Sequence, residues 1–273
     1  MKKELIIRPK KTFSWDDFKE LWRFKELFYF LSWRDLKVRY KQTAIGALWA
    51  ILQPFIAMVI FSVFFGKVAE IPSDGVPYPI FVYTGLLFWQ FFSTGLTEAS
   101  NSMVANKEIS TKVYFPRMIL PFSASITKLI DFAIATIVLA GLMIYYGYVP
   151  SLVGLAILPI LILITFFSAS GLGLFLSSVN VKYRDVRHAL PFVIQMMLFL
   201  TPVIYPVSIA GKYAWILSIN PMTGVIESAR AGLLGTMAID WQLLSISTFI
   251  SFVFLIVGWL YFRKTEQYFA DIV

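Results

Sequence analysis

The sequence predicts an all-α integral membrane protein, with six transmembrane helices per protomer, an N-terminal amphipathic interfacial helix and two short re-entrant helices between spans five and six. Three observations predict this class. The 273 residues are 58% hydrophobic and 15% charged, whereas about 25% of residues are charged in soluble domains. Several apolar runs are long enough to cross a bilayer, which takes about 20 residues. Lys and Arg gather on segments that would share one side of the membrane, as the positive-inside rule requires of the cytoplasmic side.

Composition also disfavours several other classes of protein. The apolar runs are continuous and do not alternate with polar residues, which argues against a β-barrel. The net charge of +8 comes from basic residues that flank apolar spans, so no nucleic acid partner is expected. The chain has no cysteine and a single histidine, His188, so we expect no metal site. The N-terminus is basic without an apolar h-region, so we expect no cleavable signal peptide.

Residues 1–42 are predicted to form a cytosolic tail followed by an interfacial helix. Ser14 is a candidate N-cap, and Asp16 and Asp17 suit the positive end of the helix dipole. Residues 15–31 combine aromatic and basic side chains at helical spacing, with too many charges for a span. We expect this helix to lie in the plane of the membrane surface; the alternative is a helix packed on a partner.

A transmembrane domain is predicted for residues 43–262. The basic stretch 33–43 should stop at the cytoplasmic surface, because hydrocarbon excludes charge. The predicted spans are residues 43–65, 79–103, 119–146, 152–178, 189–205 and 241–262, followed by a cytosolic tail at 263–273. Pro54 is expected to kink the first span.

The distribution of basic residues supports this layout. Twelve Lys and Arg residues fall in residues 1–42, three in the loop 104–118, three in the loop 179–188 and two after residue 262. The opposite side carries Lys67, Lys212 and Arg230, and Lys128 lies inside span three. This asymmetry of twenty against three is obtained with six spans and both termini in the cytoplasm.

The segment 206–240 does not fit a simple loop. Two apolar pieces, residues 208–219 and 221–234, are separated by Asn220 and Pro221, and each is too short to cross about 30 Å of hydrocarbon. We predict two re-entrant helices that enter the membrane from the outer face and return. They would form either an outer gate or a fixed structural plug.

The sequence offers little for catalysis. It has no P-loop, because Gly211 and Lys212 are followed by Tyr213, and neither an HExxH nor a GxSxG motif is present. Aromatic residues make up 17% of the chain. Some belong to interfacial belts, and the excess suits a conduit for sugars, since aromatic rings stack on the apolar faces of pyranose rings. We therefore predict a protein that is not an enzyme.

Ionisable residues inside spans are few. Lys128 and Asp131 lie three residues apart on one helix, so we predict that they neutralise each other. Glu98 lies toward the cytosolic end of span two, within reach of the membrane surface. Glu227 and Arg230 have the same three-residue spacing in the second re-entrant piece, which predicts that this helix faces water or a second copy.

Several motifs, taken in order over nearly the whole chain, are similar to those of a known family. They are residues 34–43, Gly46, Trp49, Gln53 and Pro54, then residues 183–186, Pro191, Gln195 and residues 201–206, and finally residues 220–222 with Arg230. Together they resemble the type-2 ABC exporter permeases for polysaccharides. The nearest group is the O-antigen (lipopolysaccharide) exporters, with capsule and teichoic acid permeases as relatives.

This resemblance implies a homodimer in a bacterial inner membrane, paired with ABC ATP-binding subunits, in two copies, that carry ATP and Mg. No cofactor is then expected in this chain. The cargo would be a polysaccharide on undecaprenyl diphosphate. Stripping water from sugar hydroxyls without replacement is costly, so such a cargo needs a continuous polar path through the surrounding membrane lipids.

The resemblance also implies three sets of functional residues. A cytosolic gate for the lipid diphosphate would comprise Arg34, Lys37, Arg39 and Lys41, for which ordinary positive-inside flanks are the alternative. Coupling to the ATP-binding subunit would use Glu108, Lys112, Tyr114, Phe115 and Arg117, with a smaller contact at residues 183–187. An outer gate would comprise Pro202, Tyr205, Asn220, Pro221, Glu227 and Arg230.

Three alternatives to O-antigen export stay open. A capsular polysaccharide or teichoic acid exporter would show the same motifs, because the sugars of the cargo leave no mark in them. A membrane enzyme acting on polyprenyl-phosphate sugars would need a carboxylate or histidine constellation at one interface. A passive channel or scaffold would lack the ATP-binding partner.

Overall fold

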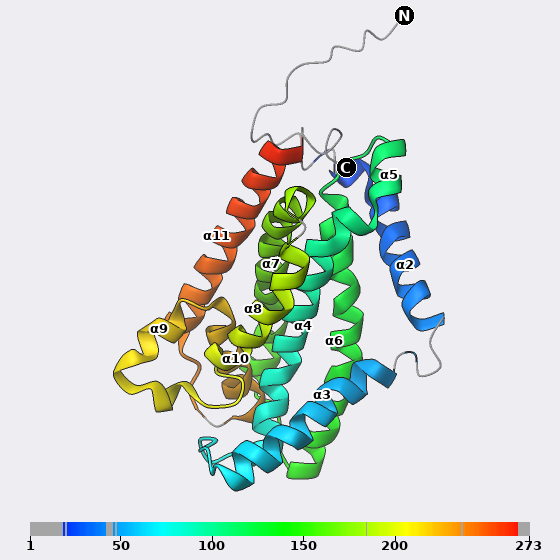
Figure 1. The fold of residues 1–273 in the computed structure, drawn as a ribbon. Coiled ribbons are helices and arrows are strands. Elements are labelled where there is room, and N and C mark those ends of the chain that lie inside the picture. The colour runs from blue at the N-terminus through cyan, green and yellow to red at the C-terminus, as the bar shows by residue number, and fades with distance from the viewer. Residues whose placement is uncertain are drawn as a thin grey trace, which may run out of the picture.

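The structure is a computed structural model that describes residues 19, 21–41, 46, 48–183, 185–235 and 237–266. Within these ranges all regular elements are helical (Figure 1). They are α2 (Lys25–Lys41), α3 (Leu48–Phe61), the π-helix η1 (Ser62–Val68), α4 (Tyr78–Ala105), α5 (Lys107–Lys112), α6 (Ile119–Tyr146), α7 (Leu152–Lys182), α8 (Val186–Leu200), the 3₁₀-helix η2 (Val207–Tyr213), α9 (Ala214–Ser218), α10 (Pro221–Leu234) and α11 (Trp241–Glu266). The predicted cap at Ser14, Asp16 and Asp17 and the tail beyond residue 266 lie outside the described residues.

Five helical segments of the described chain are long and apolar enough to cross a membrane. They are Leu48–Val68, which joins α3 to η1, and the helices α4, α6, α7 and α11. These segments correspond to predicted spans one to four and six, and α6 has the predicted bounds. The all-helical membrane class is therefore confirmed.

The predicted fifth span is wrong in extent. Helix α8 has 15 residues, which gives a length of about 22 Å, whereas the hydrocarbon core is about 30 Å thick. The backbone N–H of Thr201 still donates to Met197 O at 2.9 Å, but the chain then leaves the helix. Pro202 and Pro206 cause this break, because proline has no N–H to donate to a preceding turn.

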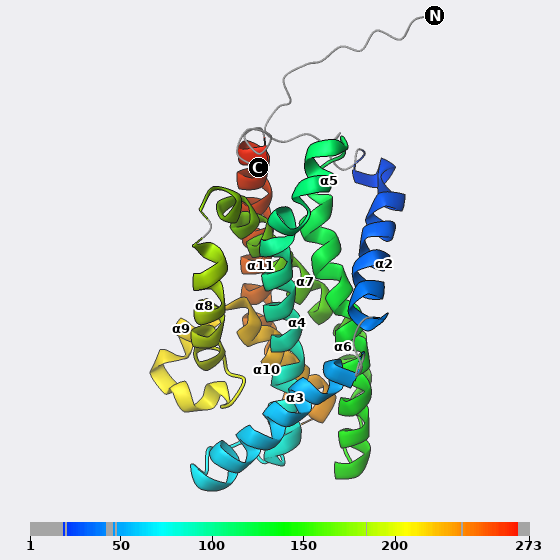
Figure 2. The same cartoon turned by 45° about the vertical axis from the view of Figure 1, so that its right-hand side comes forward.

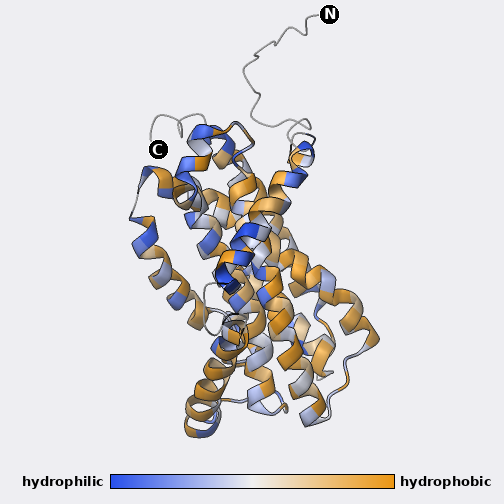
Figure 3. Ribbon diagram, turned by 90° about the vertical axis from the view of Figure 1, so that its right-hand side faces the viewer, coloured by the Kyte–Doolittle hydropathy of each residue, from blue (hydrophilic) through white to orange (hydrophobic). Residues whose placement is uncertain are grey.

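Helix α4 is the centre of the bundle. It contacts α3, α6, α7, α8 and α10, and Figures 1 and 2 show it enclosed by them. Its side chains Phe81, Tyr83, Phe88 and Phe92 are among the largest fully buried ones. Twenty of its 28 residues are buried, which agrees with its contacts to the surrounding helices. Hydrophobic residues dominate along the bundle, and hydrophilic ones gather at the end that carries α5 (Figure 3).

Helix α7 packs against α10 and α11 through glycines. A Cβ built on Gly154 would lie 2.0 Å from the carbonyl oxygen of Gly232 in α10. One built on Gly258 of α11 would lie 2.0 Å from the carbonyl oxygen of Gly171. Small residues at such crossings let backbones approach closely, which strengthens van der Waals packing where the hydrophobic effect is absent. The three helices therefore form a tightly packed unit.

Helix α2 does not cross the end of the bundle as a helix in the membrane plane would. Figures 1 and 2 show it running alongside α6, which it contacts. Leu31 is buried in a cluster with Met103, Phe115 and Trp259, whereas Phe30 and Trp33 of the same helix are exposed. Only one side of α2 therefore packs on the bundle. Lys41 ends the helix, and residues 33–41 of the predicted basic stretch 33–43 are therefore its last part.

The segment between α8 and α11 lies in the half of the bundle away from α5 (Figures 1 and 2). Helix α10 has the predicted bounds 221–234, whereas the predicted piece 208–219 is divided into η2 and α9. Thirteen of the fourteen residues of α10 are buried. The prediction that this helix faces water or a second copy is therefore wrong, since α4, α7 and α11 enclose it.

A polar cleft and a charge cluster

A cleft of about 630 Å³ lies between α3 and α8 on one side and α4 and α6 on the other. Arg39 and Tyr40, at the end of α2, also line it. The remaining lining residues are Gly46, Trp49, Ala50, Gln53, Pro54, Leu87, Trp89, Gln90, Phe91, Ser93, Thr94, Thr97, Glu98, Lys128, Asp131, Phe132, Ala135, Pro191, Ile194, Gln195 and Leu198. Residues of five helices, α2, α3, α4, α6 and α8, therefore line the cleft.

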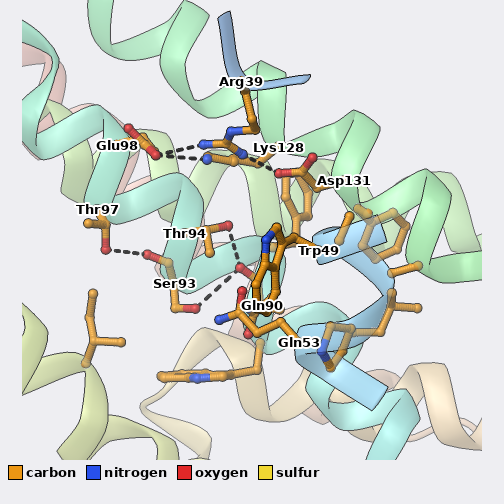
Figure 4. Close-up of a pocket in the computed structure, with 18 of the residues that line it drawn as sticks. Arg39, Trp49, Gln53, Gln90, Ser93, Thr94, Thr97, Glu98, Lys128 and Asp131 are labelled. Atoms are coloured by element: carbon orange, nitrogen blue, oxygen red, sulfur yellow. Dashed lines mark hydrogen bonds and ion pairs between the residues drawn. The ribbon is translucent and has the colours of Figure 1, made fainter. Parts of the chain in front are cut away.

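A polar stripe on α4 forms one wall of the cleft (Figure 4). It consists of Gln90, Ser93, Thr94, Thr97 and Glu98, which share one helix face at spacings of three and four residues. The Thr94 hydroxyl donates to Gln90 O at 2.7 Å, and the Thr97 hydroxyl donates to Ser93 O at 2.8 Å. Both hydroxyls thus donate to backbone carbonyls of their own helix. Each hydroxyl oxygen can still accept a hydrogen bond from a ligand in the cleft.

Carboxamides from other helices face this stripe, and aromatic rings also line the cleft. Gln53 of α3 and Gln195 of α8 line the cleft, with Trp49 and Trp89 beside them. A carboxamide both donates and accepts hydrogen bonds, and an aromatic face offers apolar contact without a directional demand. These groups suit a polar, uncharged ligand such as a sugar.

Four charged residues at the α2 end of the cleft form one network, which we call the charge cluster (Figure 4). Arg39 donates through Nη2 to Glu98 Oε1 at 2.8 Å and through Nη1 to Asp131 Oδ2 at 2.5 Å. The Lys128 ammonium donates to Glu98 Oε1 at 2.9 Å, and the Tyr40 hydroxyl donates to Asp131. The cluster joins α2, α4 and α6 and contains equal numbers of positive and negative groups.

The predicted neutralisation of Lys128 by Asp131 is therefore wrong. Lys128 pairs with Glu98 of α4, and Asp131 pairs with Arg39 of α2. On α6, Lys128 and Asp131 follow Ile119 by 9 and 12 residues, which corresponds to about 14 and 18 Å along the helix. Charges at such depth in a span are expected to be paired and to face a cavity.

The other predicted basic residues of α2 are spread out. Arg34 donates to Asp35 at 2.7 Å and to the side-chain oxygen of Asn106 at 2.7 Å. Lys37 and Lys41 are exposed. The structure thus brings Arg39 into the cleft, whereas Arg34 is held near the start of α5 and the two lysines lie on the surface.

The predicted coupling residues surround the short helix α5. Glu108 and Lys112 form an exposed ion pair at 3.8 Å, and Tyr114 is 78% exposed. Arg117 donates from its backbone to the Glu266 carboxylate at 3.1 Å. Phe115 differs from the prediction, because its ring is buried in the chain's own core beside Met118 and is not a surface contact.

The predicted outer-gate residues are brought together around the Arg230 guanidinium. It donates to Pro202 O at 2.8 Å, to Val203 O at 2.7 Å and to the Glu227 carboxylate at 2.9 Å. It also lies 3.5 Å from the centroid of the Phe81 ring. These bonds satisfy carbonyls that the break after α8 leaves without helical partners, as buried backbone in a membrane requires.

Asn220 and Tyr205 hold the same region from its ends. Asn220 caps α10 by accepting from the Met222 N–H at 3.0 Å, and it donates to the Thr201 hydroxyl at 2.6 Å. Pro221 occupies the first turn of that helix, where its missing N–H costs nothing. The Tyr205 hydroxyl donates to Phe199 O at 3.0 Å.

The polar stripe on α4 was not identified as a site by the sequence reasoning. A signal was present, because Gln90, Thr94 and Thr97 recur at helical spacing within an apolar span. In the described part of the chain, no group of three or more His, Cys, Asp or Glu residues could hold a metal ion.

Comparison with known proteins gives a consistent result. Residues 26–234 match the ABC-2 type transporter family. The chain is 31% identical over 241 residues to the O-antigen export system permease protein RfbA of Klebsiella pneumoniae, covering 88% of this chain and 92% of that protein. It is 30% identical to the Myxococcus xanthus protein of the same name, covering 78% and 82%. The polysialic acid transport protein KpsM of Escherichia coli is 23% identical, with 86% and 91% covered.

Proposed function

Because the chain belongs to the ABC-2 type transporter family, we propose that it is the permease subunit of an exporter that moves lipid-linked O-antigen polysaccharide across the inner membrane. The observation that carries the proposal is the 31% identity to an O-antigen export permease over nearly the full length of both proteins. The polysialic acid transport protein KpsM is less similar, at 23%. Export of a capsular polysaccharide or teichoic acid is the alternative.

The polar cleft is the proposed path of the sugars. A saccharide loses hydration when it enters the membrane, and each hydroxyl without a new partner raises the free energy of transfer. Gln53, Gln90 and Gln195 would supply those partners, while the exposed ring of Trp49 would stack on the sugar rings. We propose that a second copy of the chain covers the open side of the cleft in a two-fold dimer.

Energy would come from ATP and Mg bound by a separate ATP-binding subunit, in two copies. We propose that this subunit docks at α5 and the exposed Tyr114, with the Glu108–Lys112 pair and Arg117 at the edge of the contact. Phe115 would support this surface from beneath, since its ring is buried. Large exposed aromatic residues are frequent anchors of protein interfaces.

The undecaprenyl diphosphate of the carrier would first contact the basic residues of α2. Lys37 and Lys41 are exposed, and both would attract an anionic headgroup. Arg34 and Arg39 already contact carboxylates, so a diphosphate would have to compete for them. In the half of the bundle away from α5, the Arg230 network with Pro202, Tyr205, Asn220, Pro221 and Glu227 would form the outer gate.

Reconstitution tests the function and separates it from its rivals. The chain would be placed in vesicles with the ATP-binding subunit, and lipid-linked polysaccharide would be added on the ATP side. We expect ATP-dependent appearance of the polymer on the opposite side. Transport without ATP would indicate a passive channel, and turnover of the lipid-sugar without transport would indicate an enzyme; either result would refute the proposal.

A further inference from the structure

The charge cluster is partly exposed to any ligand that enters the cleft. Its Arg39 and Glu98 side chains are 37% and 47% exposed, and all its members line the cleft. Bacterial and other cytoplasmic leaflets contain anionic phospholipids, whose headgroups are attracted to Lys and Arg near the surface. An unpaired Arg39 beside Lys128 would therefore be a binding site for any phosphodiester headgroup that reaches the cleft.

From this arrangement we infer that Glu98 and Asp131 determine specificity by excluding anionic phospholipids from the cleft. The inference rests on the proposed function, because a sugar path must be kept clear of resident lipid headgroups. The two carboxylates neutralise the two cations, so the cluster carries no net charge to attract a monoanionic headgroup. They also occupy both sides of the Arg39 guanidinium, at 2.8 and 2.5 Å.

Geometry explains why two carboxylates are needed. Glu98 of α4 accepts from both Arg39 and Lys128 on the same oxygen, Oε1, and so pairs with the cations of α2 and α6. Asp131 holds the other side of the Arg39 fork on α6. A phosphate group that bound Nη1 and Nη2 of Arg39 together would have to displace both carboxylates, and each of them already makes a charge-assisted hydrogen bond.

The burial of Lys128 makes Glu98 the more important of the two. The Lys128 side chain is 3% exposed, and a buried ammonium requires a partner. Removing the negative charge of Glu98 would leave two cations and one carboxylate, Asp131, among the members of the cluster. The cluster would then carry a net charge of +1 and would favour a single phosphodiester as the missing counter-ion.

Photo-crosslinking tests this directly with the full chain in vesicles. The probes are photoactivatable phosphatidylglycerol, which is anionic, and photoactivatable phosphatidylcholine, which is zwitterionic. Labelling of peptides that contain residues 87–98 is measured for each probe. For Glu98→Gln we expect the ratio of phosphatidylglycerol to phosphatidylcholine labelling to rise about tenfold, since one charge-assisted contact to the headgroup becomes available.

Three variants serve as controls. Glu26→Gln removes the same charge from the exposed face of α2, about 20 Å along the helix from Arg39, and should leave the ratio unchanged. Arg39→Gln combined with Glu98→Gln should return the ratio to the wild-type value. Asp131→Asn is a second test, in case Glu98→Gln does not fold, and should also raise the ratio; thermal unfolding checks each variant.

Two results would overturn the inference. The first is a wild-type cleft that labels as strongly with phosphatidylglycerol as Glu98→Gln does. The second is a raised ratio that persists when Arg39 is also replaced. Neither measurement needs polysaccharide or ATP, so failure of the exporter function would be seen separately, in the reconstituted transport assay.

Discussion

Replacing Arg230 by methionine should destabilise the protein more than any exposed substitution. Methionine keeps much of the side-chain volume but removes the hydrogen bonds to Pro202 O, Val203 O and Phe81 O and to the Glu227 carboxylate. Arg230 is buried and Glu227 is largely buried, with side-chain exposures of 4% and 15%. Breaking a buried pair by removing one partner costs about 3–5 kcal/mol, because the other charge is left uncompensated.

The double variant Arg230→Met with Glu227→Gln separates the two contributions. It removes the stranded carboxylate, so its loss of stability should be smaller than the sum of the two single losses. Arg230→Lys should be intermediate, since an ammonium keeps the charge but cannot donate in a fork to two carbonyls. Lys212→Met, on the exposed part of η2, is the matched control and should change stability by less than about 0.5 kcal/mol.

The assay is the free energy of unfolding in mixed micelles titrated with a denaturing detergent and followed by tryptophan fluorescence. A loss below about 1 kcal/mol for Arg230→Met, the value typical of an average substitution, would refute the reasoning. Additive losses in the double variant would refute the part that concerns Glu227.

Three further predictions follow from the packing, the cleft and the α5 surface. Gly258→Ala should lower the free energy of unfolding by about 1–3 kcal/mol in the same titration, because its Cβ would meet Gly171 O at 2.0 Å. Gly141→Ala, with nothing within 4 Å, should be neutral or stabilising by up to about 1 kcal/mol. Gln90→Leu should reduce polysaccharide transport at least tenfold while leaving unfolding unchanged, because one hydrogen-bonding group of the path is lost; unchanged transport would contradict the proposed path. Tyr114→Ala should weaken binding of the ATP-binding subunit at least tenfold without loss of stability, whereas Phe115→Ala should cost about 3–5 kcal/mol of stability; equal binding by wild type and Tyr114→Ala would count against docking at this surface.

The sequence predicted the membrane class and most spans because these depend on local properties. Length and apolarity identify a span without knowledge of its neighbours, and α6 begins and ends where the pattern predicted. The short α8 was also within reach of sequence reasoning, since Pro202 and Pro206 are strong helix-breaking signals. The continuous apolar run from residue 189 to residue 205 predicted a longer helix than α8, which ends at Leu200.

The pairing of charges could not be predicted in the same way. A three-residue spacing favours Lys128 with Asp131 on one helix, but tertiary contacts bring in Glu98 from α4 and Arg39 from α2. Arg230 is a similar case. Three of its partners are backbone carbonyls, and no sequence pattern shows which carbonyls a distant helix break leaves unpaired.

The most direct test of the account is whether the cargo passes along the polar stripe of α4. A photo-crosslinking amino acid would be placed at Gln90, in the cleft, or at Ile137 of α6, which is 69% exposed on the outside of the protomer. Cells that also produce the ATP-binding subunit would be illuminated during export. The account predicts adducts with lipid-linked polysaccharide at position 90 and none at position 137; adducts at position 137 alone would contradict it.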